Sequence, residues 1–345
     1  MPTDADATRA LRLTLGTAGS AALALGIGGP LAFIAPLLTA KLLSSPAPRP
    51  TPAAGLMLVL SIAVAFGAGW VVSLALLPFP LVRVPLLGLM LFWTFYASER
   101  GAPPLLIVML LLALVMLPVV SVQSQQLSMT IAAGMSIGAA LAMAATWLAF
   151  ALLPDRPEVE TPGPSAATPD PLERAEVVQR AVVATVIVLP MLALVDLFQL
   201  TGDLVVLAFV ALLAQQLGQL GDAVGRGGGA LLVGNAIGGV GALVAFQVLT
   251  VVPMFPLLIG LTALTTLLCA RRIFPPTAAS PLYATALSTW ILLVASSTGG
   301  MGGEAAASFY ARLFNIALAV VYVVVASSLL RTRAGRRLSA RALPG

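Results

Sequence analysis

The chain has 345 residues, of which 59% are hydrophobic and 9% are charged, and its formal net charge is +5. A water-soluble domain has about a quarter of its residues charged, so this composition excludes one and places most of the surface in lipid. The sequence holds no histidine and a single cysteine, Cys269. This excludes a disulfide framework and the commonest general base, and we expect neither enzymatic activity nor a cofactor or metal.

Uninterrupted apolar runs predict membrane helices, because about 20 apolar residues cross the hydrocarbon core. The first six predicted spans are Ala10–Gly28, Leu31–Ser44, Ala54–Leu77, Leu81–Ala97, Leu105–Ser121 and Leu127–Leu153. The next six are Val177–Phe198, Leu204–Leu220, Gly229–Val248, Met254–Ala270, Pro281–Ser297 and Ala305–Leu330. The predicted fold is therefore an all-α, polytopic transmembrane bundle of about 12 helices. The second span is short, so a re-entrant segment, with ten or eleven crossings in all, is the alternative.

Cationic residues favour cytoplasmic loops. With the N-terminus inside, all but two of the 18 cations fall at cytoplasmic ends of the predicted spans, the exceptions being Arg83 and Arg312. The pattern predicts a bacterial inner-membrane protein with both termini in the cytoplasm. The basic charge is then explained by topology, and the lipid bilayer rather than a nucleic acid is the expected partner.

The two halves of the sequence match each other. Arg12 falls opposite Arg180 at an offset of 168, and Gly88 falls opposite Gly260 at an offset of 172 that continues through two Pro-Pro dipeptides. Phe79-Pro80 falls opposite Phe255-Pro256. Because each unit holds an even number of crossings, we expect two parallel six-helix repeats. The expected divisions are a first repeat over 1–153, a Pro-rich acidic cytoplasmic linker over 154–176, a second repeat over 177–330 and an Arg-rich cytoplasmic tail over 331–345.

The segments Leu11–Thr17 and Pro30–Pro36, with Lys41 after them, resemble the fusaric acid resistance-like superfamily of aromatic acid exporters, in particular a short branch without the large cytoplasmic domain. The stretch Pro281–Thr289 supports this resemblance. It implies efflux of aromatic carboxylic acids together with a periplasmic membrane-fusion adaptor and a small membrane subunit.

Charged residues inside a membrane span are costly and are candidates for function. Arg312 lies about eight residues into the last predicted helix, where it could bind a substrate carboxylate in a bidentate manner. Asp196, Asp203 and Glu304 lie at predicted periplasmic helix ends and are candidates for proton coupling in a chain without histidine. The alternatives are a structural ion pair between Arg312 and one of these acids, or ordinary acids at helix starts.

Three further residues could line a substrate path: Lys41, Gln125 and Gln215. Membrane anchoring, or solvation of helix ends, would explain them equally well. Gly134–Gly138 spells a G-x-S-x-G pattern, but small residues that let membrane helices approach are the ordinary interpretation. We therefore predict an exporter of small aromatic or amphipathic organic acids that is coupled to protons. The alternative is a non-transporting subunit that docks a periplasmic adaptor.

Overall fold

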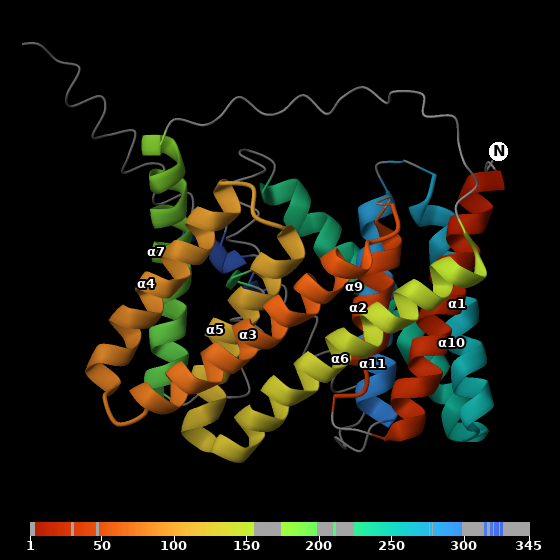
Figure 1. Ribbon diagram of the computed structural model, residues 1–345, viewed down its shortest axis with the longest axis horizontal. Coiled ribbons are helices and arrows are strands. Elements are labelled where there is room, and N and C mark those ends of the chain that lie inside the picture. Colours follow the sequence, from red (N-terminus) through yellow and green to blue (C-terminus); the bar gives the residue numbers. More distant parts are fainter. Residues whose placement is uncertain are drawn as a thin grey trace, which may run out of the picture. The chain divides into compact units, whose positions relative to one another are not determined.

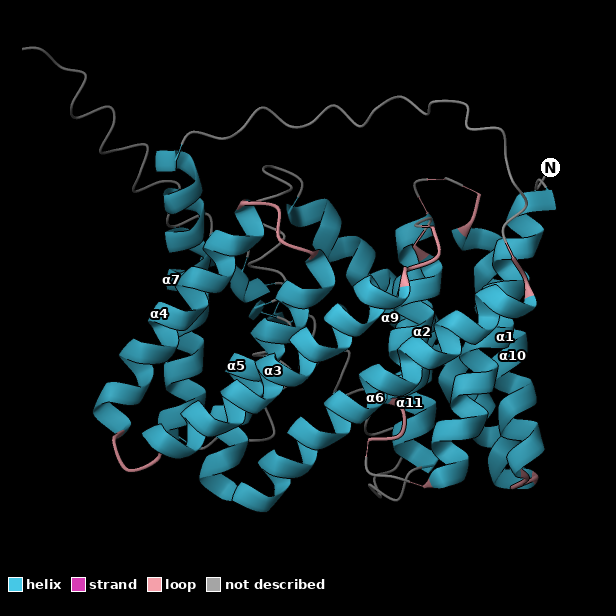
Figure 2. Ribbon diagram, in the orientation of Figure 1, coloured by secondary structure: helices cyan, strands magenta, loops and turns pink. Residues whose placement is uncertain are grey.

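The fold was analysed in a computed structural model of the 345-residue chain. The structure describes residues 4–28, 31–45, 48–154, 174–198, 210–211, 224–275, 277, 279–298 and short stretches between 314 and 326. Within these residues the regular elements are all helical, as Figure 2 shows. The predicted helical class is confirmed for the part of the chain that is described.

Ten helices are defined within the described residues, and each overlaps one of the predicted spans. Their bounds are α1 Asp4–Ile27, α2 Ile34–Ser44, α3 Pro52–Leu76, α4 Pro80–Glu99, α5 Pro104–Gln123, α6 Gln125–Leu152, α7 Arg174–Phe198, α9 Val224–Val251, α10 Phe255–Ile273 and α11 Ser280–Thr298. Proline begins α4 and α5, where its missing N–H costs no helical hydrogen bond. The predicted spans over 204–220 and 305–330 lie mostly outside the described residues.

Seven of these helices are long and apolar enough to cross a membrane, which supports the predicted class of membrane protein. They are α1, α3, α5, α6, α7, α9 and α10. The second predicted span is the main difference. Helix α2 has 11 residues and extends for about 16 Å, roughly half of the hydrocarbon thickness. The predicted number of about 12 crossings therefore stays a prediction.

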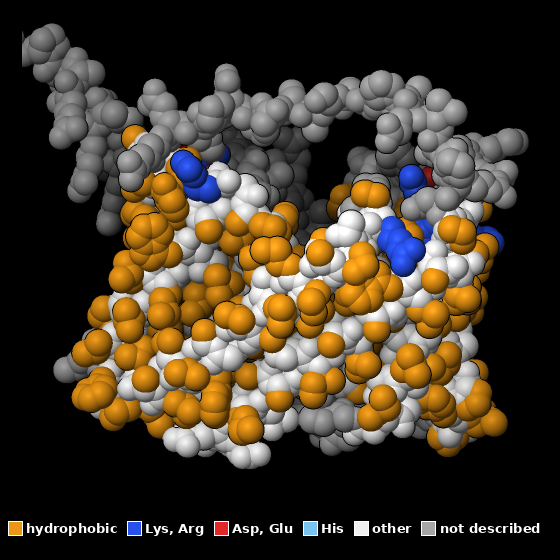
Figure 3. Space-filling view, viewed as in Figure 1, with side chains coloured by type: hydrophobic (Ala, Val, Ile, Leu, Met, Phe, Trp, Pro, Cys, Tyr) orange, Lys and Arg blue, Asp and Glu red, His pale blue; other side chains and the backbone are white. Residues whose placement is uncertain are grey.

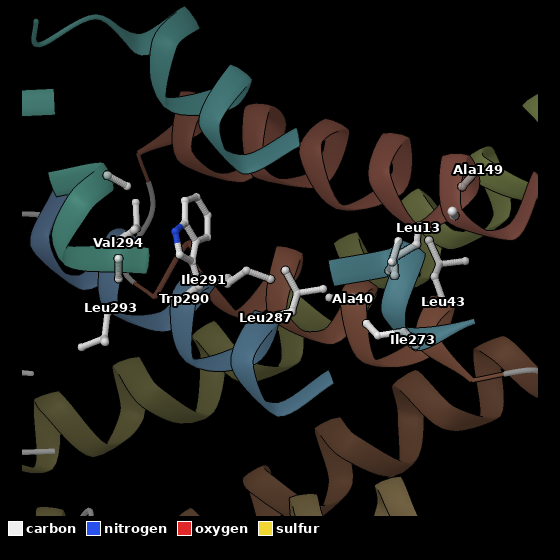
Figure 4. Packing of buried hydrophobic residues seen from close by; sticks show 14 of the residues in the cluster. Leu13, Ala40, Leu43, Ala149, Ile273, Leu287, Trp290, Ile291, Leu293 and Val294 are labelled. Atoms are coloured by element: carbon white, nitrogen blue, oxygen red, sulfur yellow. The ribbon is translucent and has the colours of Figure 1, made fainter. Parts of the chain in front are cut away.

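The chain divides into two compact units. The first comprises Met1–Val64, Thr130–Thr168 and Ala230–Leu313. Here α1 packs against both α2 and α10, and α11 packs against α10 and α2 (Figure 1). Leu13, Leu43, Leu287 and Trp290 belong to a buried cluster that joins these helices, shown in Figure 4. Apolar packing holds the first unit together.

The second unit comprises Ala65–Met129, Pro169–Gly229 and Phe314–Gly345. Its main contact joins α4 to α7, and α5 packs against both of these helices (Figure 1). Gly88 in α4 allows this contact, since a Cβ atom there would lie 3.0 Å from Leu189 of α7. The candidate site described below lies in this pair of helices.

Each unit takes helices from both halves of the sequence. In the first unit, the first helix of the N-terminal half, α1, packs against α10, the fourth of the C-terminal half. In the second unit, α7, the first helix of the C-terminal half, packs against α4, the fourth of the N-terminal half. The contacts are reciprocal, as a duplicated chain would give. The predicted repeats describe sequence likeness, and their boundaries stay a prediction.

The surface of the described helices is strongly apolar. Side chains such as Met57, Val64 and Leu152 are more than 60% exposed. Figure 3 shows hydrophobic atoms spread over the helices on the face in view, with few Lys or Arg side chains among them. Such a surface is suited to lipid and unsuited to water.

Candidate functional site

A buried ion pair joins α4 to α7. The Nε and Nη2 atoms of Arg83 donate to Oδ2 of Asp196 over 3.1 and 2.6 Å. Only 7% of the Arg83 side chain and 6% of the Asp196 side chain are exposed. The other carboxylate oxygen, Oδ1 of Asp196, is buried and has no hydrogen-bond partner among the described residues. The pair is thus buried, and one of its two carboxylate oxygens accepts no hydrogen bond from the described residues. Burial of a charged group with an unused acceptor costs free energy in an apolar surrounding.

A second ion pair joins the same two helices at their opposite ends. Nη1 of Arg180 lies 3.7 Å from Oε2 of Glu99, and its Nη2 donates to Glu176 over 2.5 Å. Arg83 and Glu99 are 16 residues apart in α4, as are Arg180 and Asp196 in α7. The helices are therefore antiparallel and in register, with the two pairs about 24 Å apart. The positive-inside pattern predicts that the Arg83–Asp196 end is periplasmic.

The corresponding contact in the first unit, between α1 and α10, is apolar. By the sequence offsets, Asp196 corresponds to Gly28, and Arg83 corresponds to Phe255 or, through the Phe-Pro dipeptides, to Ile259. Phe255 does lie at this end of α1, since a Cβ atom on Gly26 would be 3.8 Å from its ring. The corresponding positions are thus apolar in the described part of one unit and hold an ion pair in the other.

At the other end of α1, a cation serves a structural purpose. Arg12 donates through Nε and Nη2 to the carbonyl oxygen of Leu153, over 2.9 and 2.7 Å. Its guanidinium also lies 4.0 Å from the centre of the Phe150 ring. These contacts satisfy a carbonyl group beyond the last turn of α6. The corresponding Arg180 instead pairs with two carboxylates.

The predicted site residues have different surroundings. Asp196 is buried and paired with Arg83. The alternative pairing with Arg312 stays a prediction, because Arg312 lies outside the described residues. Lys41 is exposed near the end of α2, and no ion pair with a described residue holds it. Gln125 is exposed as the first residue of α6, a helix whose start is capped by Ser124. The other predicted site residues lie outside the described residues: Arg312, Gln215, Asp203 and Glu304.

Arg83 is the functional candidate that sequence reasoning missed. It was noted only as an exception to the positive-inside pattern, although it lies three residues after the start of α4. The signal was available, because the cost of an intramembrane charge that drew attention to Arg312 applies equally to Arg83. What the sequence could not supply was its partner, which lies 113 residues away in the other half.

The small-residue interpretation of the glycine patterns is confirmed where the structure describes them. A Cβ atom on Gly138 would lie 2.6 Å from Ile34 of α2. A Cβ atom on Gly234 would lie 2.8 Å from the carbonyl oxygen of Leu282 in α11, and one on Gly238 would overlap the carbonyl of Ala286. These glycines allow close helix contacts. Ser136, in the middle of the G-x-S-x-G pattern, donates to the carbonyl oxygen of Ala132 within its own helix.

Comparison with known proteins yields one family match. No curated protein and no solved structure matches the chain. Residues 9–149 match the model of a family described as "Protein of unknown function (DUF2955)". The match covers less than half of the chain and nearly coincides with the predicted first repeat, 1–153. The first six predicted spans are therefore similar to this family, and they include α1 to α6.

Proposed function

We propose that the chain is a transporter of the bacterial inner membrane that exports small aromatic or amphipathic organic acids. The buried Arg83–Asp196 pair carries the proposal. Ionisable residues within membrane spans face cavities or one another and mark paths for substrates, ions or protons. A guanidinium recognises carboxylates, and a buried carboxylate takes up and releases protons, so the pair holds both functions that a proton-linked carrier of organic anions needs.

Two comparisons with the first unit support a role beyond folding. The positions in the first unit that correspond to Asp196 and Arg83 are Gly28 and Phe255 or Ile259, so this end of the helix contact does not require an ion pair. In addition, α4 and α7 contain the interior prolines Pro85 and Pro190, whereas α1 and α10 have none. An interior proline leaves a carbonyl group without its helical partner and makes a bend less costly. The helix pair with the ions is thus also the more deformable one.

Similarity in sequence supports the substrate class. The matched residues 9–149 include Leu11–Thr17 and Pro30–Pro36, two of the segments through which the chain resembles the aromatic acid exporters. In this proposal Arg83 and the predicted Arg312 are the cations for substrate carboxylates, and Asp196 is the coupling carboxylate. A periplasmic adaptor and a small membrane subunit are the proposed partners, again by that resemblance.

The test is efflux of radiolabelled 4-hydroxybenzoate from proteoliposomes, corrected for leakage from protein-free liposomes. The double variant Arg83→Gln/Asp196→Asn removes both charges without stranding either, and we expect it to lose most of the efflux. Arg312→Ala should also lose efflux. Arg271→Ala is the control, because Arg271 is exposed at the end of α10 and its removal should leave efflux unchanged. Normal efflux by a well-inserted double variant would refute the proposed site.

The same preparation addresses the alternative of a non-transporting subunit. If the wild-type protein transports no aromatic acid but binds a membrane-fusion adaptor stably, a docking role is supported instead. Reporter fusions near Pro162 and in the tail over 331–345 should both lie on the cytoplasmic side. Opposite locations would overturn the predicted orientation.

A further inference from the structure

The hydrogen bonds of the Arg83–Asp196 pair leave two groups open. Both donated hydrogen bonds go to Oδ2, and no described residue donates to Oδ1 although it is buried. On Arg83, none of the described residues accepts a hydrogen bond from Nη1. The pair therefore offers one unused acceptor and one unused donor. A carboxylic acid has the complementary groups, since its carbonyl oxygen accepts and its hydroxyl donates.

The charges around this pair are few. Helix α4 contributes Arg83. Its other ionisable side chains are Tyr96, which contacts Trp93, and Glu99, and both lie toward the opposite end of the helix. Helix α5, which packs against both α4 and α7, has no ionisable residue. The hydroxyl of Tyr322 donates to the carbonyl oxygen of Ile187, nine residues before Asp196. The predicted neighbours Asp203, Glu304 and Arg312 lie outside the described residues.

Charge balance then decides how an organic anion can enter. The resting pair has one positive and one negative charge and is neutral. A second carboxylate would make the buried group net negative, and burying an uncompensated charge is strongly unfavourable. Uptake of one proton on Oδ1 of Asp196 removes that charge and converts the oxygen from an acceptor into a donor. Arg83 then pairs with the incoming carboxylate, and the group is neutral again.

We infer that the Arg83–Asp196 pair binds a small organic anion together with one proton, so that acid and proton cross the membrane in the same direction. This inference rests on the proposed transport function and adds to it the sign of the coupling. An exchange mechanism, in which the proton displaces the substrate, would require the two to compete. At this pair they cooperate, because protonation of Asp196 frees Arg83 for the anion. Transport is then electroneutral, and the substrate gradient drives export when cytoplasmic acid accumulates.

The test is calorimetric titration of the purified full-length protein with benzoate at pH 7 to 8, in buffers of different ionisation enthalpy. Benzoate is fully ionised there, so the buffer dependence counts the protons that the protein takes up. We expect one proton per benzoate and an apparent Kd that rises about tenfold per pH unit while Asp196 is ionised. Binding without proton uptake, or with proton release, would overturn the inference while leaving the proposed efflux intact. An absence of benzoate binding at millimolar concentration would also overturn it.

Three variants locate the effect. Asp196→Asn imitates the protonated carboxyl group, so it should bind benzoate with no proton uptake and with a Kd that no longer depends on pH. The double variant Arg83→Gln/Asp196→Asn should lose binding by at least tenfold, because the cation is missing. Glu99→Gln is the matched control, since it alters the ion pair at the other end of the same helices and should keep both binding and proton uptake. Unchanged proton uptake in Asp196→Asn would contradict the assignment. If the wild-type protein shows no efflux in the proteoliposome assay, the proposed function itself is refuted.

Discussion

At the scale of single residues, the Arg83–Asp196 pair is a poor source of stability. Removing two ions from water costs several kcal/mol for each ion, and their attraction offsets this fully only when the remaining lone pairs are also satisfied. Here Oδ1 of Asp196 receives no hydrogen bond from the described residues. The corresponding positions near Gly26 and Phe255 in the first unit are apolar. A costly feature that the fold does not need is best explained by what it binds.

This view makes a prediction for stability. Arg83→Gln strands a buried carboxylate and should destabilise the protein by about 3–5 kcal/mol. Asp196→Asn together with Arg83→Gln removes both charges and should recover most of that loss, which gives a large coupling energy in a double-mutant cycle. Denaturation in detergent, followed by circular dichroism, measures the three variants. A double variant that is no more stable than Arg83→Gln would show that the pair contributes to the fold itself.

Glycine contacts make a second prediction at this scale. Gly238→Ala places a methyl group against the backbone of Ala286 in α11, so we expect a loss of about 1–3 kcal/mol through overpacking. Gly260→Ala is the matched control, because nothing lies within 4 Å of its Cβ position and alanine is the better helix former. Thermal unfolding in detergent should show a lowered Tm for Gly238→Ala and not for Gly260→Ala. Equal Tm values would mean that α9 and α11 are not as close as described.

The site could be predicted only in part, for reasons visible in these residues. Asp196 stood out because a carboxylate in an apolar run is expensive. Its partner could not be chosen from the sequence, since pairing Arg83 with Asp196 depends on which helices touch. Lys41 and Gln125 were ambiguous from the start, because exposed ends of helices use the same residue types as substrate paths. Both are exposed in the structure.

At the scale of helices, the residues that interrupt apolar runs predicted the helix starts better than hydrophobic periodicity did. Proline and charge located the start of α4 and α5 within a residue of the prediction. The start of α2 was three residues late, because Gly28 and Leu31 adopt positive φ angles and delay the helix after the turn. Such a conformation is uncommon for leucine and is not visible in the sequence. The pairing of α1 with α10 and of α4 with α7 could not be predicted from the sequence either, since an apolar helix surface does not indicate which helix it packs against.

The helix pairing yields a third prediction. In a variant with Cys269→Ala and a protease site in the linker over 155–173, Gly88→Cys and Leu189→Cys should form an oxidative crosslink, because these positions are in contact. After cleavage, the two halves should migrate as one band under non-reducing conditions. Gly88→Cys with Leu194→Cys is the control, because Leu194 is 46% exposed on α7 and should crosslink poorly. Equal crosslinking of both pairs would contradict the packing of α4 on α7.

At the scale of the whole molecule, each of the two compact units combines helices from both halves of the sequence. Two six-helix repeats that folded separately would each keep their own first and fourth helices together. Here α1 packs with α10 and α7 packs with α4, so each repeat supplies part of both units. This exchange also lets corresponding positions diverge. In the second unit, α4 and α7 carry two ion pairs and interior prolines, while the first unit has apolar residues at the positions that correspond to Arg83 and Asp196.

The exchange leads to a final prediction on folding. Expressed alone, residues 1–153 lack the partners of α1 and α4, which are α10 and α7, and would expose apolar faces that normally contact other helices. We expect this half to aggregate in detergent or to be degraded, and residues 154–345 to behave in the same way. Co-expression should rescue both, because the halves bury these faces against each other, and the two polypeptides should co-purify through a tag on one of them. Size-exclusion chromatography separates the outcomes. The 1–153 polypeptide could instead be monodisperse and fully helical and fail to co-purify with residues 154–345. Each half would then fold on its own, and the reciprocal pairing would be wrong.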